Sequence, residues 1–166
     1  TLSPIDLVDD DWLTNQATFD LTDNFTKIAP SFNTQRFPIA DGTSFVRPVT
    51  LRNLSPDHTL VLVNGTRRHR SAMVNLQIAP LGTVNQGAQG VDFATIPALA
   101  IERVEVLRDG ASAQYGSDAI AGVINLVLKS DVSPITLSAK AGTTTHGDGE
   151  MLDVSADGGW GIARGV

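Results

Sequence analysis

Charged residues stand at close spacing in a segment that otherwise has the composition of a buried strand. The segment IERVEVLR at residues 101–108 carries Glu102, Arg103, Glu105 and Arg108 among apolar positions. A lone ion is too costly to bury, so charges in such a strand need partners. Arginine and carboxylate groups form charge-assisted hydrogen bonds, and such a set is typical of ionic contacts.

Residue patterns typical of catalysis or of metal binding are absent from the sequence. None of the three lysines follows a glycine as in a P-loop, and no G-x-G-x-x-G, H-E-x-x-H or G-x-S-x-G motif occurs. His58, His69 and His146 are too scattered to indicate a pre-formed metal site. We therefore expect no enzyme activity, no catalytic residue, no metal and no cofactor.

The composition is that of one ordinary folded domain. The 166 residues are 42% hydrophobic and 18% charged, which excludes a disordered or collagen-like chain. A formal charge of -6 argues against nucleic acid as the main partner, and the basic run Arg67–Arg70 is interpreted as a solvated hairpin arm. The absence of cysteine excludes disulfides, and no apolar run is long enough for a transmembrane helix.

The charged segment opens a longer motif, IERVEVLRDGASAQYGSDAIAGVINLVLK, at residues 101–129. Strand-like runs at 101–107 and 122–128 flank a stretch that contains Gly110 and Gly116. The run VINLVL is apolar on both faces apart from Asn125, as expected of a strand that is covered on both sides.

This motif closely resembles the C-terminal half of the plug domain of TonB-dependent outer-membrane receptors. The family pattern is roughly I-E-R-[IV]-E-V-[LI]-R-G-P-x-S-x-x-Y-G-x-x-A-[IL]-x-G-V-I-N, and the chain departs from it at Asp109 and Gly110. The phrase APSFN at 29–33 and Arg52 also match, although Asn53 stands where the family has glycine. Asparagine tolerates a left-handed backbone, so the turn is expected to survive.

The resemblance implies an α+β fold, with a small mixed β-sheet, short helices and long loops as a plug domain over residues 1–131. The incomplete first strands of a transmembrane β-barrel are expected at 132–166. By resemblance, the plug occludes a roughly 22-stranded outer-membrane barrel, helps bind ligand at the outer face and rearranges when TonB pulls on it. A stand-alone soluble envelope module is the alternative, and a periplasmic signalling domain is a third possibility.

The resemblance also implies partners and contacts. The partners are the barrel of the same receptor, TonB through a TonB box upstream of this chain, and a scarce nutrient such as a siderophore, cobalamin or a sugar. Because neither end has a natural start or stop, we expect a piece of a longer protein. The residues expected to make plug–barrel ionic contacts are Arg52, Glu102, Arg103, Glu105 and Arg108, with local pairing of Arg103 and Glu105 as an equal alternative.

The N-terminal half of the chain has clear local signals. Residues 5–8 alternate like a strand, and the acidic run 9–11 favours a helix start. Apolar residues at helical spacing predict a second helix that ends before Pro30, with its aromatic side chains in the core. The strand predicted at 59–63 is followed by Asn-Gly, which indicates a type I′ hairpin turn and a return strand at 66–70.

Two further segments bear on function. Residues 71–92 form a long polar stretch without periodicity, and in the family such a loop faces the ligand. Its candidate ligand-facing residues are Asn75, Gln77, Asn85, Gln86 and Gln89, whose neutral side chains suit a sugar and equally a solvated loop. Residues 135–141 and 151–156 alternate between apolar and polar, as in a hairpin of a transmembrane barrel.

Overall fold

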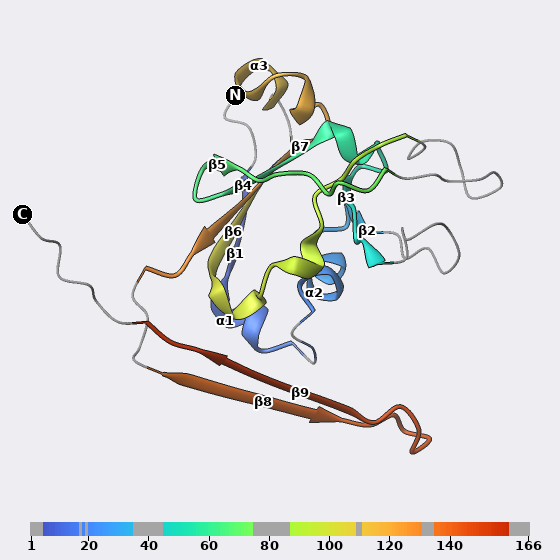
Figure 1. The fold of residues 1–166 in the computed structure, drawn as a ribbon, viewed down its shortest axis with the longest axis vertical. Coiled ribbons are helices and arrows are strands. Elements are labelled where there is room, and N and C mark those ends of the chain that lie inside the picture. Colours follow the sequence, from blue (N-terminus) through green and yellow to red (C-terminus); the bar gives the residue numbers. More distant parts are fainter. Residues whose placement is uncertain are drawn as a thin grey trace, which may run out of the picture.

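A five-stranded mixed sheet forms the centre of the molecule (Figure 1). The computed structural model describes residues 5–16, 18, 20–34, 45–74, 87–108, 111–130 and 135–159. The sheet has the order β1-β6-β7-β4-β5, and its strands are β1 (Ile5–Asp9), β4 (Thr59–Val63), β5 (Thr66–Arg67), β6 (Ile101–Leu107) and β7 (Gly122–Leu128). Strands β4 and β7 are parallel and the other neighbours are antiparallel, which confirms the α+β fold with a small mixed sheet.

Short helices cover one face of this sheet and enclose the main core. The covering elements are α1 (Asp10–Thr14), α2 (Leu21–Ile28), the 3-10 turns η3 (Phe93–Thr95) and η4 (Ala98–Ala100), and the small sheet of β2 (Phe32–Thr34) and β3 (Val49–Leu51). Phe25, Phe32 and Phe93 pack together with ring centroids 5.1–5.8 Å apart. The aromatic side chains are therefore core residues, as the sequence predicts.

Side-chain caps explain where the helices α1 and α2 begin. The Asp9 carboxylate accepts a hydrogen bond from the backbone N–H of Trp12 at 3.3 Å, and Asp20 accepts one from the N–H of Thr22 at 2.9 Å. Each bond satisfies a backbone donor that has no partner within the helix. The acidic run at 9–11 is thus a helix cap, and α2 ends at Ile28 ahead of Pro30, as predicted.

The opposite face of the sheet is covered only in part. The helix α3 (Ala111–Tyr115) and the turn η5 (Ser117–Ala119) pack with Leu60, Leu62 and Val123 in a second, smaller core. Beyond this core the same face carries Glu105 and Asn125, which lie opposite each other on β6 and β7. Strand β7 is therefore buried at its start and only half-buried towards its end, which limits the predicted two-sided covering to the first residues.

Positive backbone angles occur at the two turns where the sequence predicts them. Asn64 and Gly65, with φ of 49° and 74°, connect β4 to β5 in the conformation that a type I′ turn requires. Strand β5 ends at Arg67, whereas the sequence predicted Arg70. After Arg67 the chain leaves the sheet, and the backbone N–H of Ser71 donates to the carbonyl oxygen of Gly90. Asn53 has φ of 58°, so the left-handed turn survives without glycine.

Gly122 allows a close approach at the start of β7. It has φ of 144°, and a Cβ there would lie 2.6 Å from the carbonyl oxygen of Leu107 and 2.9 Å from Leu51 Cδ1. The same position lies 3.5 Å from the Cα of Arg108. Because Gly122 has no side chain, the end of β6 and the end of β3 can both lie close to the start of β7.

Candidate functional site

Arg108 lies directly after β6 and forms an ion pair with Asp6 of β1. The sheet creates this contact, because Asp6 lies opposite Val106 in the register of β1 and β6. Both side chains are more than one third exposed. The Nε atom of Arg108 is buried, and it has no hydrogen-bond partner among the residues that the structure describes. The carboxylate beside Arg108 thus comes from the edge strand of its own sheet, and a contact with a barrel stays a prediction.

The other charged residues of β6 form a connected polar network. Arg103 donates to Glu105 at 2.9 Å and to Glu102 at 2.8 Å. Asn125 of β7 donates to Glu105 at 2.9 Å and accepts a hydrogen bond from the backbone N–H of Gly65 at 3.0 Å. The network therefore runs across the open part of the sheet, from β6 over β7 to the turn after β4.

These contacts favour the charged forms of Glu105 and Arg103. The hydrogen bond from Asn125 lowers the pKa of Glu105, as does Arg103, and together they outweigh the opposing effect of partial burial. The hydrogen bond to Glu105 raises the pKa of Arg103. Arg103 and Glu105 thus pair locally, as the alternative interpretation of the sequence proposed.

Arg52 occupies an exposed position in the turn after β3. Its φ of 54° is left-handed, and its backbone N–H donates to Ser31 at 2.7 Å. Because Leu51 and Arg108 both approach Gly122, Arg52 lies at the same end of the main sheet as Arg108. The structure thus brings together the ends of the two segments whose arginines are predicted to meet the barrel wall.

Most of the predicted ligand-facing loop lies outside the described residues. This holds for Asn75, Gln77, Asn85 and Gln86. Gln89 is described, and its backbone N–H donates to Asp57 at 3.2 Å. Its side-chain amide lies 3.5 Å from the carbonyl oxygen of Ser71. In this arrangement Gln89 joins the two ends of the loop.

Sequence reasoning missed an ionic cluster that anchors the basic run. Arg67 forms an ion pair with Asp118 of η5, and Arg70 lies 3.4 Å from Asp118 and 3.2 Å from Asp57. Arg67 and Arg70 are exposed, as in the predicted solvated hairpin arm, but they also form ion pairs that the sequence did not predict. No signal in the sequence connects these positions, because Asp118 meets Arg67 only when β4 and β7 pair.

A second missed contact joins the start of α2 to the segment before β3. Arg47 lies 3.2 Å from the carboxylate of Asp20, and its backbone N–H donates to Asp92 at 3.1 Å. Burial raises the pKa of Asp20, but hydrogen bonds from Thr22 and the charge of Arg47 outweigh it and lower the pKa overall. These bonds hold the turn η3 beside the main core.

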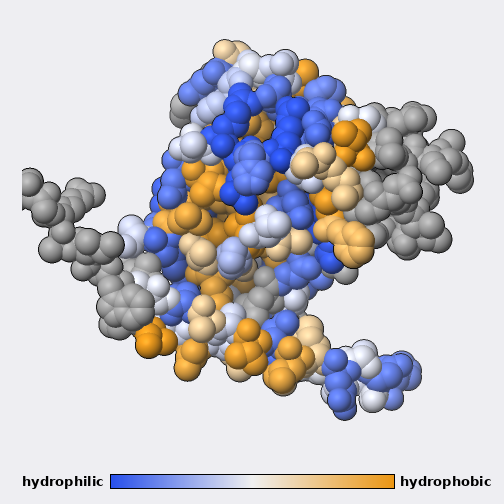
Figure 2. Space-filling model, viewed as in Figure 1, coloured by the Kyte–Doolittle hydropathy of each residue, from blue (hydrophilic) through white to orange (hydrophobic). Residues whose placement is uncertain are grey.

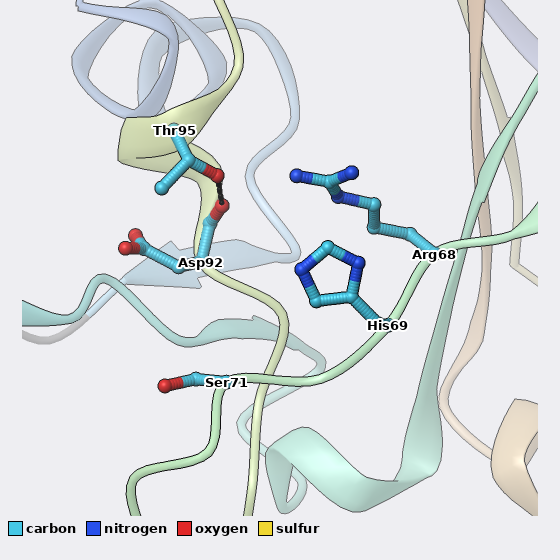
Figure 3. Close-up of a pocket in the computed structure, with 5 residues that line it drawn as sticks. All are labelled: Arg68, His69, Ser71, Asp92 and Thr95. Carbon is cyan, nitrogen blue, oxygen red and sulfur yellow. Dashed lines mark hydrogen bonds between the residues drawn. The ribbon is translucent and has the colours of Figure 1, made fainter.

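A polar pocket of about 140 Å³ lies between the chain after β5 and the turn η3 (Figure 3). Its lining residues are Arg68, His69, Ser71, Asp92 and Thr95. The close-up shows the Arg68 guanidinium and the His69 ring extending from one side, with the backbone of Asp92 and Thr95 on the other. The pocket thus has two nitrogen-rich side chains at one wall.

Comparison with known proteins assigns the chain to a family. The family profile described as TonB-dependent Receptor Plug Domain matches residues 1–123 of the 166. The chain belongs to this plug domain family. The resemblance of the 101–129 motif, which suggested the family, is therefore confirmed.

Named relatives of the chain include an outer membrane protein and a transporter. The iron-regulated outer membrane virulence protein of Vibrio cholerae is 38% identical over 84 residues, which are 50% of this chain and 12% of the relative. The vitamin B12 transporter BtuB of Photobacterium profundum is 29% identical over 127 residues, 74% of this chain and 18% of the relative. The plug domain thus spans less than one fifth of the length of either relative. The plug domain is located in the outer membrane, as predicted.

A solved structure shows the same fold. A variant of the ferric enterobactin receptor PfeA of Pseudomonas aeruginosa matches with a TM-score of 0.62 and 22% identity, over 93% of this chain and 22% of that receptor. Neither this protein nor the two relatives is named as an enzyme. No helix in the described part of the plug domain is long and apolar enough to cross a membrane.

Proposed function

We propose that this chain is the plug, or gate, of a TonB-dependent outer-membrane active transporter. Residues 1–131 occlude the lumen of a β-barrel, and residues 132–166 form the first, incomplete strands of that barrel. The plug helps bind a scarce nutrient, such as a siderophore or cobalamin, on the extracellular side and rearranges when TonB pulls on it. Membership in the plug domain family and the names of the relatives support this proposal.

The observation that carries the proposal is the orientation of the C-terminal hairpin. Strands β8 (Thr136–Gly142) and β9 (Met151–Asp157) pair over seven positions, and their apolar side chains face away from the rest of the molecule. Leu137, Leu152 and Val154 are 74%, 73% and 71% exposed. Figure 2 shows hydrophobic residues in a row along this hairpin, at the bottom of the view.

The polar face of the hairpin is directed towards the plug. Lys140 donates through Nζ to the carbonyl oxygens of Gln16 and Thr18, at 2.6 and 3.4 Å. Ser138, Asp153 and Ser155 alternate with the exposed apolar residues and are half-buried. In water, a hairpin with this pattern would bury its apolar face, because each fully buried leucine or valine contributes about 1.5–3 kcal/mol. Lipid on the outer side and a polar plug on the inner side match the observed arrangement.

The alternative, a stand-alone soluble envelope module, fits these observations less well. Such a module would leave three large apolar side chains of one hairpin in water while its lysine contacts backbone carbonyls. Relatives that carry the plug sequence within much longer receptors also favour the gate.

Site-directed spin labelling of the complete receptor in liposomes tests the proposed orientation. This chain contains no cysteine, so single cysteines in it can be labelled selectively in a cysteine-free receptor. Labels at 137, 139, 152 and 154 should be accessible to dissolved oxygen from the lipid, whereas labels at 138, 153 and 155 should not. Equal accessibility on the two faces, or a pattern with the faces exchanged, would contradict the proposal.

The ionic contacts of the plug with the barrel wall are part of the same proposal. Arg52 and Arg108 lie at one end of the sheet, and Arg108 is partly exposed beside Asp6. A barrel carboxylate could replace Asp6 because a solvated ion pair exchanges partners at little cost. Arg108→Ala in the complete receptor should loosen the plug and raise passive leakage of small solutes. Unchanged leakage together with unchanged uptake would remove Arg108 from the contact.

A further inference from the structure

The pocket beside β5 contains an arginine, Arg68, that differs from its two neighbouring arginines in its contacts. Arg67 and Arg70, which flank it in sequence, are neutralised by Asp118 and Asp57. The backbone N–H of Arg68 donates to Val61 at 2.9 Å, but the half-buried Arg68 side chain makes no hydrogen bond or ion pair with any residue that the structure describes. A guanidinium that is partly removed from water without a carboxylate partner is a strong site for an anion.

His69 and Ser71, which also carry hydrogen-bond donors, line the same pocket. Figure 3 shows the His69 ring next to the Arg68 guanidinium, on the side that faces the turn η3. The Ser71 hydroxyl oxygen accepts a hydrogen bond from the backbone N–H of Met73 at 3.2 Å, so its proton is available for another acceptor. Thr95 donates its proton to the carbonyl oxygen of Asp92 at 2.8 Å. The donors to a bound group would therefore come from Arg68, His69 and Ser71.

The acidic residue of the pocket does not neutralise this wall. Asp92 uses its Oδ1 atom to accept hydrogen bonds from the backbone N–H groups of Arg47 and Ala94, at 3.1 and 3.0 Å. Its carboxylate points away from Arg68 in Figure 3. Arg68 and Asp92 form no ion pair, so the guanidinium keeps its capacity for a ligand of opposite charge.

We propose that this pocket binds a carboxylate or phosphate group of an anionic ligand, with Arg68 as the main contact. Its volume of about 140 Å³ accommodates one such group rather than a whole nutrient. The two walls follow β5 and precede η4, and between them runs the polar stretch that the family resemblance assigns to the ligand side. The anion-site proposal therefore rests on the proposed function. It assigns an acidic ligand, whereas the neutral side chains of the 71–92 stretch suggested a sugar.

Isothermal titration calorimetry on the purified complete receptor tests this site. The probes are inorganic phosphate, tricarballylate as a multivalent carboxylate, and glucose as a neutral control. At least one anion should bind, with an affinity that falls as salt is added, and glucose should not bind. Arg68→Gln should weaken anion binding roughly ten- to a hundredfold, the loss expected for a charge-assisted hydrogen bond.

Arg67→Gln is the matched control, because Arg67 adjoins the pocket in sequence but pairs with Asp118. The anion affinity of Arg67→Gln should stay within about twofold of that of the parent. The unfolding midpoints of both variants should differ from that of the parent by no more than is usual for a surface substitution. Equal losses in the two variants would indicate non-specific attraction to the basic run and overturn the proposal. Equal affinity of Arg68→Gln and the parent, or no anion binding by the parent, would also overturn it.

The spin-label experiment keeps the two proposals separate. If the hairpin labels face lipid but Arg68→Gln binds anions normally, the gate stands and the anion site falls. If Arg68 governs anion binding but the hairpin labels show no lipid-facing side, the pocket stands and the assignment of residues 132–166 to the barrel falls.

Discussion

Replacement of Gly122 by alanine should destabilise the plug more than any other single methyl addition in the motif. Gly122 is buried at the start of β7, with φ of 144°. An added Cβ would lie 2.6 Å from the carbonyl oxygen of Leu107 and 2.9 Å from Leu51 Cδ1. The leucine side chain can move, but the carbonyl belongs to the backbone of β6 and is held in the central sheet.

Two costs add in this variant. A residue with a side chain in this region of backbone conformation costs about 1–3 kcal/mol. Insertion of a methyl group into a packed site costs typically a further 1–3 kcal/mol. The free energy of unfolding should therefore fall by about 2–6 kcal/mol, which is a large part of the roughly 5–15 kcal/mol of an ordinary domain.

Gly116→Ala separates the two costs. Gly116 also has a positive φ, 90°, but a Cβ there would meet no atom within 4 Å. This variant should show only the backbone cost, about 1–3 kcal/mol. Urea unfolding can be followed through Trp12, which packs against the main core, in a chain with Trp160 replaced by phenylalanine. Equal losses for Gly116→Ala and Gly122→Ala would refute the argument from the close contact with Leu107.

Three further predictions concern the ionic network, the edge strand and the core. Because the pKa of Glu105 is lowered, its stabilising contribution is present above the usual glutamate pKa of about 4.3 and is lost as the pH falls through the lower folded-state value. The difference in unfolding free energy between the parent and Glu105→Gln should therefore shrink over that interval in urea titrations, and a constant difference would contradict the assignment. Asp6→Asn should lower the unfolding free energy by less than about 1 kcal/mol, because both partners of the pair with Arg108 are partly exposed. A double-mutant cycle with Arg108→Gln measures the coupling energy of the pair, and a value near zero would show that the pair adds nothing to stability. Phe93→Ala should lower the unfolding free energy by about 3–5 kcal/mol, since the ring is fully buried against two other rings, and a loss below 1 kcal/mol in urea unfolding would show that the core refills the cavity.

The open part of the central sheet has a consequence for a moving plug. The polar network on β6 and β7 is partly exposed and held by hydrogen bonds, whereas the opposite face is sealed by the aromatic core. Solvated ionic contacts separate and re-form at low cost, but an apolar core does not. A rearrangement of the plug would therefore begin at the ionic contacts and leave the aromatic core intact.

The sequence by itself determined the elements whose signals are local. The motif at 101–129 contains β6 and β7 with the predicted bounds, Asp9 of the acidic run caps α1, and Asn64 and Gly65 form the turn. These features follow from residues a few positions apart, through strand alternation, helix capping and backbone preference. The motif also identified the family, because its glycines and charges recur at specific spacing.

Only the tertiary structure decided which charges meet. Arg108 pairs with a carboxylate 102 positions away, and Arg67 with one 51 positions away. No periodic pattern encodes such pairs, because they depend on which strands become neighbours in the sheet. The order β1-β6-β7-β4-β5 places Asp6 beside Arg108 and carries Asp118 to Arg67. It leaves Arg68 without a carboxylate among the described residues, so the candidate anion site became visible only when the strands were placed.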